Sequence, residues 1–183
     1  PVLIQRNTGY FDETIQPLAS AYAIRNACMQ KKDIEITTPM KEELMLSSYV
    51  TMDMFYPYIR TYLMMTPSSK LSEYFLISEG IENHLKKNAE KCATYQEFIQ
   101  ACVNYRYTAS KIRRCLVQIM MQITKEDVKN LPKVDTLRIL AFNDSGREWL
   151  HSKRKEEVHI ASKFAEIPKP YRTMEYQATQ LYT

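Results

Sequence analysis

Apolar residues recur at helical spacing along most of this chain. Phe55, Ile59 and Leu63 follow one another at intervals of four residues within 54–65, where Pro57 is expected near the start of a helix. A second stripe runs through 109–123 and consists of Ile112, Leu116, Ile119 and Ile123. Such spacing places side chains on one face of a helix. By the same pattern we expect helices over 20–32, from 41, from 68, and over 79–91 and 95–104.

Two apolar runs indicate strands instead. Val2, Leu3 and Ile4 belong to a predicted strand over 1–7, and residues 137–142 are predicted to form a buried strand, followed by a turn and a helix with Trp149. Residues 125–127 and Pro132 are predicted to break the helical pattern, and a short helix is expected near 173–182. The sequence therefore predicts a mainly α fold with one or two short strands in its last third.

The first strand has no partner strand near it in the sequence, and a lone strand is unstable. We therefore interpret the chain as the C-terminal part of a longer protein.

The composition indicates a globular protein and argues against a membrane span, a zinc site and a glycine-rich phosphate loop. The 183 residues are 45% hydrophobic and 25% charged, as in a globular protein, and no apolar run approaches the roughly 20 residues of a membrane span. The four cysteines form no C-x-x-C pair and are expected to be core residues of a reduced, cytoplasmic protein. The three histidines have no spacing typical of a zinc site, so no metal site is predicted. The three glycines, at positions 9, 80 and 146, are too far apart in the sequence to form a P-loop or a dinucleotide loop.

The segment Ser20 to Arg25 is a candidate phosphate site. A serine that opens a helix can direct its hydroxyl and the first backbone N–H groups toward an anion, and Arg25 adds a charge about one turn later. The alternative is a serine N-cap on an ordinary amphipathic helix, with Arg25 in solvent.

The strongest cluster of positive charge lies over residues 106–114. Thr108 is the expected N-cap, so that Lys111, Arg113 and Arg114 occupy the first two turns, where cations oppose the helix dipole. A helix that begins this way favours an external anion, and two nearby tyrosines, at 105 and 107, can stack on unpaired bases. The alternative is a solvated basic face. The net charge of +4 suits an anionic partner only if the charge is clustered in this way.

Glu82 and His84 form a possible acid–base pair in a second group, which also contains Lys86 and Lys87. Glu82 and Lys86 are at the i,i+4 spacing of a helical ion pair, and no third catalytic group is in view. We therefore predict no catalytic residue here.

Taken in order, seven segments resemble the bacterial tRNA(Met) cytidine acetate ligase family, which is nucleotidyltransferase-like. They are G-Y-F-D from Gly9, S-A-Y-A-I-R from Ser20, F-Y-P-Y-I-R from Phe55, E-G-I-E-N-H-L-K-K from Glu79, R-Y-T-A-S-K-I-R-R from Arg106, I-T-K-E-D-V from Ile123 and L-A-F-N-D-S-G-R-E from Leu140. The resemblance implies an ATP-dependent enzyme that activates acetate as acetyl-adenylate. It then acetylates the wobble cytidine of elongator tRNA(Met) to N4-acetylcytidine.

The resemblance also implies roles for residues of this chain. Residues 1–35 would end the nucleotidyltransferase-like α/β domain, and residues 36–183 would form a mostly helical, tRNA-binding domain. Arg6, Ser20 and Arg25 would contact ATP, with Mg accompanying the ATP. The expected tRNA contacts are Lys86, Lys87, Arg106, Tyr107, Thr108, Lys111, Arg113 and Arg114. The family usually has arginine where His84 stands. The H-x-G-H motif of the family is absent from this sequence, so this chain alone is predicted to be inactive.

A rival hypothesis is a non-enzymatic helical adaptor whose basic hairpin binds protein or nucleic acid, for example in a helix-turn-helix manner. Neither hypothesis predicts the oligomeric state.

Overall fold

The computed structural model describes residues 9, 12–34, 38–47, 49–153 and 159–181. These residues form two compact units, of which the first ends at Thr51 and the second begins at Met52. The predicted domain division after residue 35 stays a prediction, and residues 35–37 lie outside the described residues. The strand predicted over 1–7 lies outside the described residues.

The first unit holds two helices, α1 (Ala21–Met29) and α2 (Lys41–Leu46). Its small core consists of Ala27, Cys28 and Ile34, against which Ile24 and Leu44 pack. Helix α1 buries Ala23, Ala27 and Cys28 on one face, as a four-residue repeat requires.

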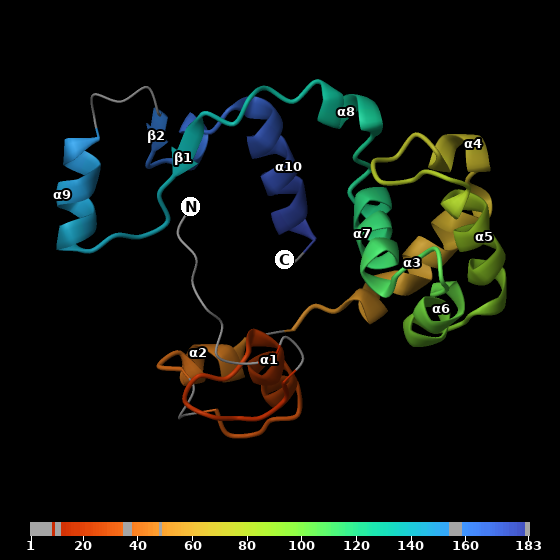
Figure 1. Cartoon of the computed structure of the whole chain (residues 1–183), viewed down its shortest axis with the longest axis horizontal. Helices are drawn as coiled ribbons and strands as arrows, with labels where there is room; N and C mark the ends of the chain where they lie inside the picture. The colour runs from red at the N-terminus through yellow and green to blue at the C-terminus, as the bar shows by residue number, and fades with distance from the viewer. Residues whose placement is uncertain (1–8, 10–11, 35–37, 48, 154–158, 182–183) are drawn as a thin grey trace. The chain divides into compact units, whose positions relative to one another are not determined.

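The second unit contains a bundle of helices with a continuous core. Its helices are α3 (Met52–Met65), α4 (Ser68–Leu71), α5 (Ile81–Lys91), α6 (Tyr95–Cys102) and α7 (Ala109–Met120). Helix α3 contacts α5, α6 and α7, and α6 also contacts α5 and α7 (Figure 1). The predicted stripes supply this core: Ile59 and Leu63 from α3, and Ile112, Leu116 and Ile119 from α7. Pro57 lies inside α3, five residues after its first residue Met52, and not at its start.

All four cysteines are buried and free, which confirms them as core residues. Burial raises the pKa of the Cys102 thiol to about 12, and burial also raises the pKa of Cys115. Both thiols therefore stay protonated and unreactive at neutral pH.

In the remainder of the second unit, Ala161 and Ile167 are the buried residues among those described. This remainder comprises α8 (Lys125–Lys129), β1 (Thr136–Arg138), α9 (Asp144–Ser152), β2 (His159–Ala161), the 3-10 turn Phe164–Glu166 and α10 (Lys169–Gln180). Strands β1 and β2 pair in parallel, with Leu137 opposite Ile160, and α9 lies between them in sequence. The prediction of a mainly α fold with one or two short strands is confirmed for the described residues.

Two local predictions were wrong here. The predicted break is displaced: it lies at 121–124, between α7 and α8, whereas residues 125–127 are helical because Thr124 and Asp127 form a capping box that starts α8. The segment 137–142 is not a buried strand: pairing ends at Arg138, and the side chains of Leu137 and Leu140 are 51% and 83% exposed. An apolar run alone does not reveal whether another element covers it.

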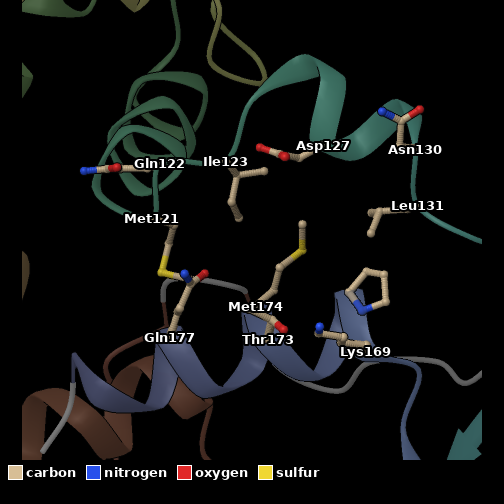
Figure 2. Close-up of a pocket in the computed structure, with 11 residues that line it drawn as sticks. Met121, Gln122, Ile123, Asp127, Asn130, Leu131, Lys169, Thr173, Met174 and Gln177 are labelled. Atoms are coloured by element: carbon tan, nitrogen blue, oxygen red, sulfur yellow. The ribbon is translucent and has the colours of Figure 1, made fainter.

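Helix α10 buries none of its residues. One of its faces borders a cavity of about 570 Å³ that the end of α7 and α8 also line (Figure 2).

Candidate nucleic-acid interface

Several basic side chains of the bundle end on backbone carbonyl groups. The Lys86 ammonium donates to the carbonyl oxygens of Leu63, at 2.9 Å, and of Met64 and Thr66, all at the C-terminal end of α3. A helix C-terminus leaves such carbonyls without intrahelical partners and carries partial negative charge. Lys86 is therefore a helix cap, and its charge is directed into the protein.

Arg60 performs the reciprocal role on the neighbouring helix. Its Nε donates to the carbonyl oxygen of Ala89 at 2.8 Å, near the C-terminal end of α5. Lys125 likewise donates to Ser72, the C-cap of α4, at 2.7 Å. His84 Nε2 lies 2.9 Å from the carbonyl oxygen of Cys102, the last residue of α6. His84 is thus a structural residue, and no acid–base arrangement with Glu82 is formed.

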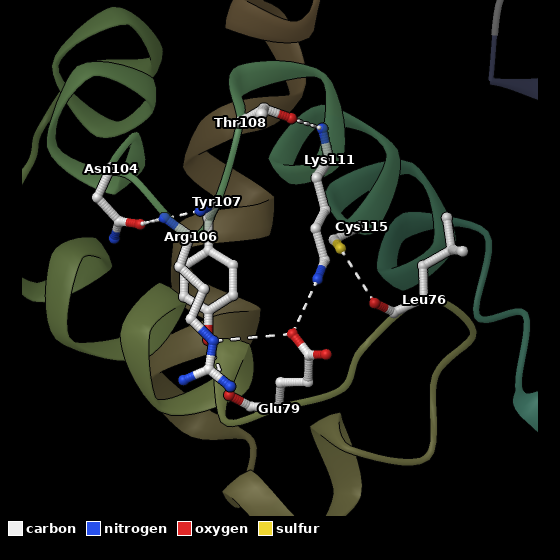
Figure 3. Close-up of polar contacts among 8 residues, drawn as sticks. All are labelled: Leu76, Glu79, Asn104, Arg106, Tyr107, Thr108, Lys111 and Cys115. Carbon is white, nitrogen blue, oxygen red and sulfur yellow. Dashed lines mark hydrogen bonds and ion pairs between the residues drawn. The ribbon is translucent and has the colours of Figure 1, made fainter.

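The turn between α6 and α7 is held by Asn104. Its side-chain oxygen accepts hydrogen bonds from the backbone N–H groups of Arg106, at 2.8 Å, and Tyr107, at 2.9 Å. Thr108 then caps α7, as predicted, by accepting from the Lys111 N–H at 3.2 Å (Figure 3). The chain entering α7 is therefore fixed by local hydrogen bonds, which places the basic residues reproducibly.

Glu79 neutralises part of the basic cluster. Its carboxylate lies 3.7 Å from Arg106 Nε and 3.5 Å from Lys111 Nζ, and both pairs converge on one oxygen (Figure 3). The positive charge at the start of α7 thus has an internal counter-ion. Both pairs are partly exposed to solvent, so each contributes little to stability.

Tyr107 is buried, in contrast to the exposed stacking residue that was predicted. Its side chain is 5% exposed, its hydroxyl donates to the carbonyl oxygen of Glu79 at 2.8 Å, and its ring packs against His84. Lys111 and Arg106 lie over the same ring. A base cannot reach this ring without displacing these contacts. Tyr105, two residues earlier, is fully exposed at the tip of the turn.

The remaining basic residues of the predicted tRNA contacts differ in the contacts that they already make within the protein. Arg113 lies beside the Tyr95 hydroxyl, where burial raises the tyrosine pKa and the arginine charge opposes that rise. Arg114 is exposed and donates to the carbonyl oxygen of Ser110, one turn earlier, at 3.3 Å. Lys87 is exposed on α5. Arg113, Arg114 and Lys87 are therefore the predicted residues best placed to meet a ligand.

The N-terminus of α1 shows the predicted cap. Ser20 is 3% exposed; its Oγ accepts from the Ala23 N–H at 3.0 Å and donates to the Asp12 carbonyl oxygen at 2.7 Å. The hydroxyl is thus committed to ordering the helix. Arg25 is exposed, whereas Arg6 lies outside the described residues.

Within the described ranges, no group of three or more histidine, cysteine, aspartate or glutamate side chains could hold a metal ion. No described helix is long and apolar enough to cross a bilayer.

Over residues 1–183 the sequence matches the family model described as HIGH Nucleotidyl Transferase. A Limosilactobacillus reuteri protein named tRNA(Met) cytidine acetate ligase is 30% identical over 97% of this chain and 49% of its own length. A Mycoplasmopsis synoviae protein of the same name is 36% identical over 68% of this chain and 41% of its own length. The chain thus spans about half the length of the first relative and less of the second.

Two solved structures share the fold. The apo crystal structure of Thermotoga maritima TmcAL matches with a TM-score of 0.75 and 20% identity, over 94% of this chain and 47% of that one. A second form, with bound alpha-thio ATP, gives a TM-score of 0.69 and 21% identity, over 89% of this chain and 44% of that one.

Proposed function

Since the chain belongs to the HIGH nucleotidyl transferase family, and specifically resembles its tRNA(Met) cytidine acetate ligases, we propose that it is part of an ATP-dependent ligase that modifies tRNA. The observation that carries the proposal is the match of 97% of the chain to a relative of that name. The family predicted from the ordered segments is thereby confirmed.

The reaction we propose is the one that the family resemblance implies. Acetate is activated by ATP as acetyl-adenylate, and the acetyl group passes to the wobble cytidine of elongator tRNA(Met) to form N4-acetylcytidine. The H-x-G-H motif is absent from these 183 residues, so we expect this chain alone to bind substrates without activating acetate.

On the ATP side we propose that Arg25, with Arg6, faces the phosphates, where a fixed positive charge stabilises the charge that develops during adenylate formation. The Ser20 hydroxyl is buried and already bonded, so its contribution is to order the start of α1. Mg would enter with the ATP.

On the tRNA side we propose that Arg113, Arg114 and Lys87 meet backbone phosphates, which position an RNA without reading its sequence. Arg106 and Lys111 are shared with Glu79, so they contribute more weakly. Lys86 and Thr108 act through the fold, as helix caps.

The test is binding of the full chain to total tRNA and to duplex DNA of equal charge, at two salt concentrations. We expect a preference for tRNA that persists at the higher salt. The change Arg113→Ala/Arg114→Ala should reduce the salt slope by about 1 for each backbone phosphate that the variant no longer neutralises. The matched control is Lys31→Ala/Lys32→Ala, which removes the same charge from two exposed positions after α1.

Two outcomes would contradict the proposal. Equal, salt-sensitive binding to tRNA and DNA would favour the adaptor hypothesis. An equal effect of the two double variants would show that only net charge matters, and would remove α7 from the interface.

A further inference from the structure

The cavity beside α10 is a second candidate binding site, separate from the basic cluster on α7. It measures about 570 Å³, within the range of pockets that hold small molecules. The C-terminal end of α7 and the residues after it form one side, α8 forms another, and α10 lies opposite (Figure 2). The space is open to solvent and large enough for one nucleotide.

Apolar side chains line the interior from both sides. Met121, Ile123 and Leu131 come from the α7–α8 side, and Met174 comes from α10 (Figure 2). Methionine side chains are flexible and polarizable, and they make favourable contacts with aromatic rings. A flat, neutral ring is the ligand group that fits between such surfaces.

A row of polar side chains follows the same face of α10. Lys169, Thr173 and Gln177 are spaced four residues apart and therefore lie above one another on the helix, over roughly 12 Å. All three are exposed, and none makes a side-chain hydrogen bond or ion pair with another described residue. Their order is a cation, a hydroxyl and an amide, so three kinds of polar group are available along one line.

The charge opposite this row restricts the ligand further. Asp127 lines the α8 side, and hydrogen bonds from the Thr124 hydroxyl and backbone N–H lower the pKa of its carboxyl group. The carboxylate is therefore negative at neutral pH and disfavours an anion on that side. A phosphate is favoured only near Lys169, and the group that enters the interior must be uncharged.

We propose that this cavity binds one unpaired nucleotide of the RNA partner, with its base against Met121 and Met174. Gln177 pairs with the base edge, because an amide offers both a donor and an acceptor. Thr173 faces the ribose, and Lys169 meets the phosphate. The identification of the ligand as RNA rests on the proposed function, whereas the nucleotide chemistry rests on the cavity itself.

The test uses the full chain with four probes: cytidine monophosphate, adenosine monophosphate, ribose 5-phosphate and a short unstructured RNA oligonucleotide. Binding is measured by calorimetry and by NMR saturation transfer. We expect both mononucleotides to bind about tenfold more tightly than ribose 5-phosphate, and the oligonucleotide to bind more tightly still. Tighter binding of a mononucleotide than of the oligonucleotide would overturn the RNA assignment in favour of a free nucleotide.

The variant Thr173→Phe fills the cavity and should weaken binding of the mononucleotides about tenfold or more. Its control is Thr179→Phe, the same change on the same helix outside the cavity. Gln177→Ala should reduce binding too, with Gln100→Ala on α6 as its control. Since α10 buries none of its residues, these changes should leave the unfolding temperature unchanged.

Several results would overturn the proposal: no binding of any nucleotide probe, equal binding of ribose 5-phosphate, or equal effects of Thr173→Phe and Thr179→Phe. Loss of tRNA binding in Arg113→Ala/Arg114→Ala with no effect of Thr173→Phe on any probe would refute the cavity and leave the proposed function standing. Nucleotide binding that Thr173→Phe weakens, in a chain that does not bind tRNA, would refute the proposed function and leave the cavity standing as a nucleotide site.

Discussion

The positive charges of the helical bundle fall into two sets that the structure uses differently. The capping set, Arg60, Lys86 and Lys125, donates to carbonyl groups at the ends of α5, α3 and α4. The α7 cluster, which consists of Arg106, Lys111, Arg113 and Arg114, lies at or just before the N-terminal half of a helix, where the dipole disfavours cations. The capping set is fully explained by the fold. The α7 cluster is only partly compensated, by Glu79, so it retains charge for a ligand.

The net charge of the protein counts both sets alike, although only one of them has charge available for a ligand. Lys86 and Lys87 are neighbours of the same type on α5, yet one is bonded to three carbonyl groups and the other is exposed. The direction in which each side chain leaves the helix decides which of them stabilises the protein and which can meet an RNA phosphate.

The sharpest test replaces these two neighbours. Lys86→Ala should lower the free energy of unfolding by about 2 kcal/mol, because the substitution removes hydrogen bonds from a charged donor. Lys87→Ala, its matched control, should change the free energy of unfolding by less than about 0.5 kcal/mol. Urea denaturation measures both, and equal decreases would show that Lys86 is not a helix cap.

The second test separates the buried tyrosine from the exposed one. Tyr107→Phe removes the hydroxyl that donates to Glu79 and should lower the free energy of unfolding by about 1 kcal/mol. Tyr105→Phe removes a hydroxyl from an exposed ring and should have no measurable effect. Thermal unfolding of the two variants is the comparison, and a larger decrease for Tyr105→Phe would contradict the described turn.

The third test removes the counter-ion of the α7 cluster. Glu79→Gln should raise tRNA affinity about threefold while changing stability by less than about 1 kcal/mol, because both ion pairs are partly exposed. Glu90→Gln removes an exposed glutamate from α5 and is the control. Unchanged affinity in Glu79→Gln would indicate that Arg106 and Lys111 do not face the RNA.

The smallest effect concerns pH. Hydrogen bonds from Thr124 lower the pKa of Asp127 from its ordinary value of 3.8. The unfolded chain therefore binds a proton at a higher pH than the folded chain does, so this contribution is complete above that value and is lost as the pH falls through the lowered pKa. Asp127→Asn should destabilise the protein at pH 6 and make less difference near pH 3. If Asp127→Asn lowers the free energy of unfolding equally at both pH values, the charged carboxylate is not the cause of the stabilisation.

Local signals predicted the helices and their caps well. Ser20 and Thr108 cap α1 and α7 as expected, since an N-cap depends on residues within one turn of the chain. The stripes on α3 and α7 supply the core, because a repeat of four residues determines which face a helix buries. The exposure of Leu137 and Leu140 could not be predicted in this way, since burial depends on what other segments cover.

The candidate interface was predicted only as a set of charges. Glu79 stands 27 residues before Arg106, and nothing in that spacing indicates that the two side chains meet. The cavity beside α10 likewise joins residues near 122 with residues near 173, and no local pattern brings them together.

By itself, therefore, the sequence determined the family, the mainly helical class and most helix starts, because those follow from ordered motifs and short-range periodicity. Only the tertiary structure decided that Lys86 caps α3, that Tyr107 is buried beneath Arg106 and Lys111, and that a cavity lies against α10. The physical reason is the distance along the chain over which each interaction acts. Helix formation and capping act over a few residues, whereas burial, ion pairing and cavities depend on segments that meet only when the chain is folded.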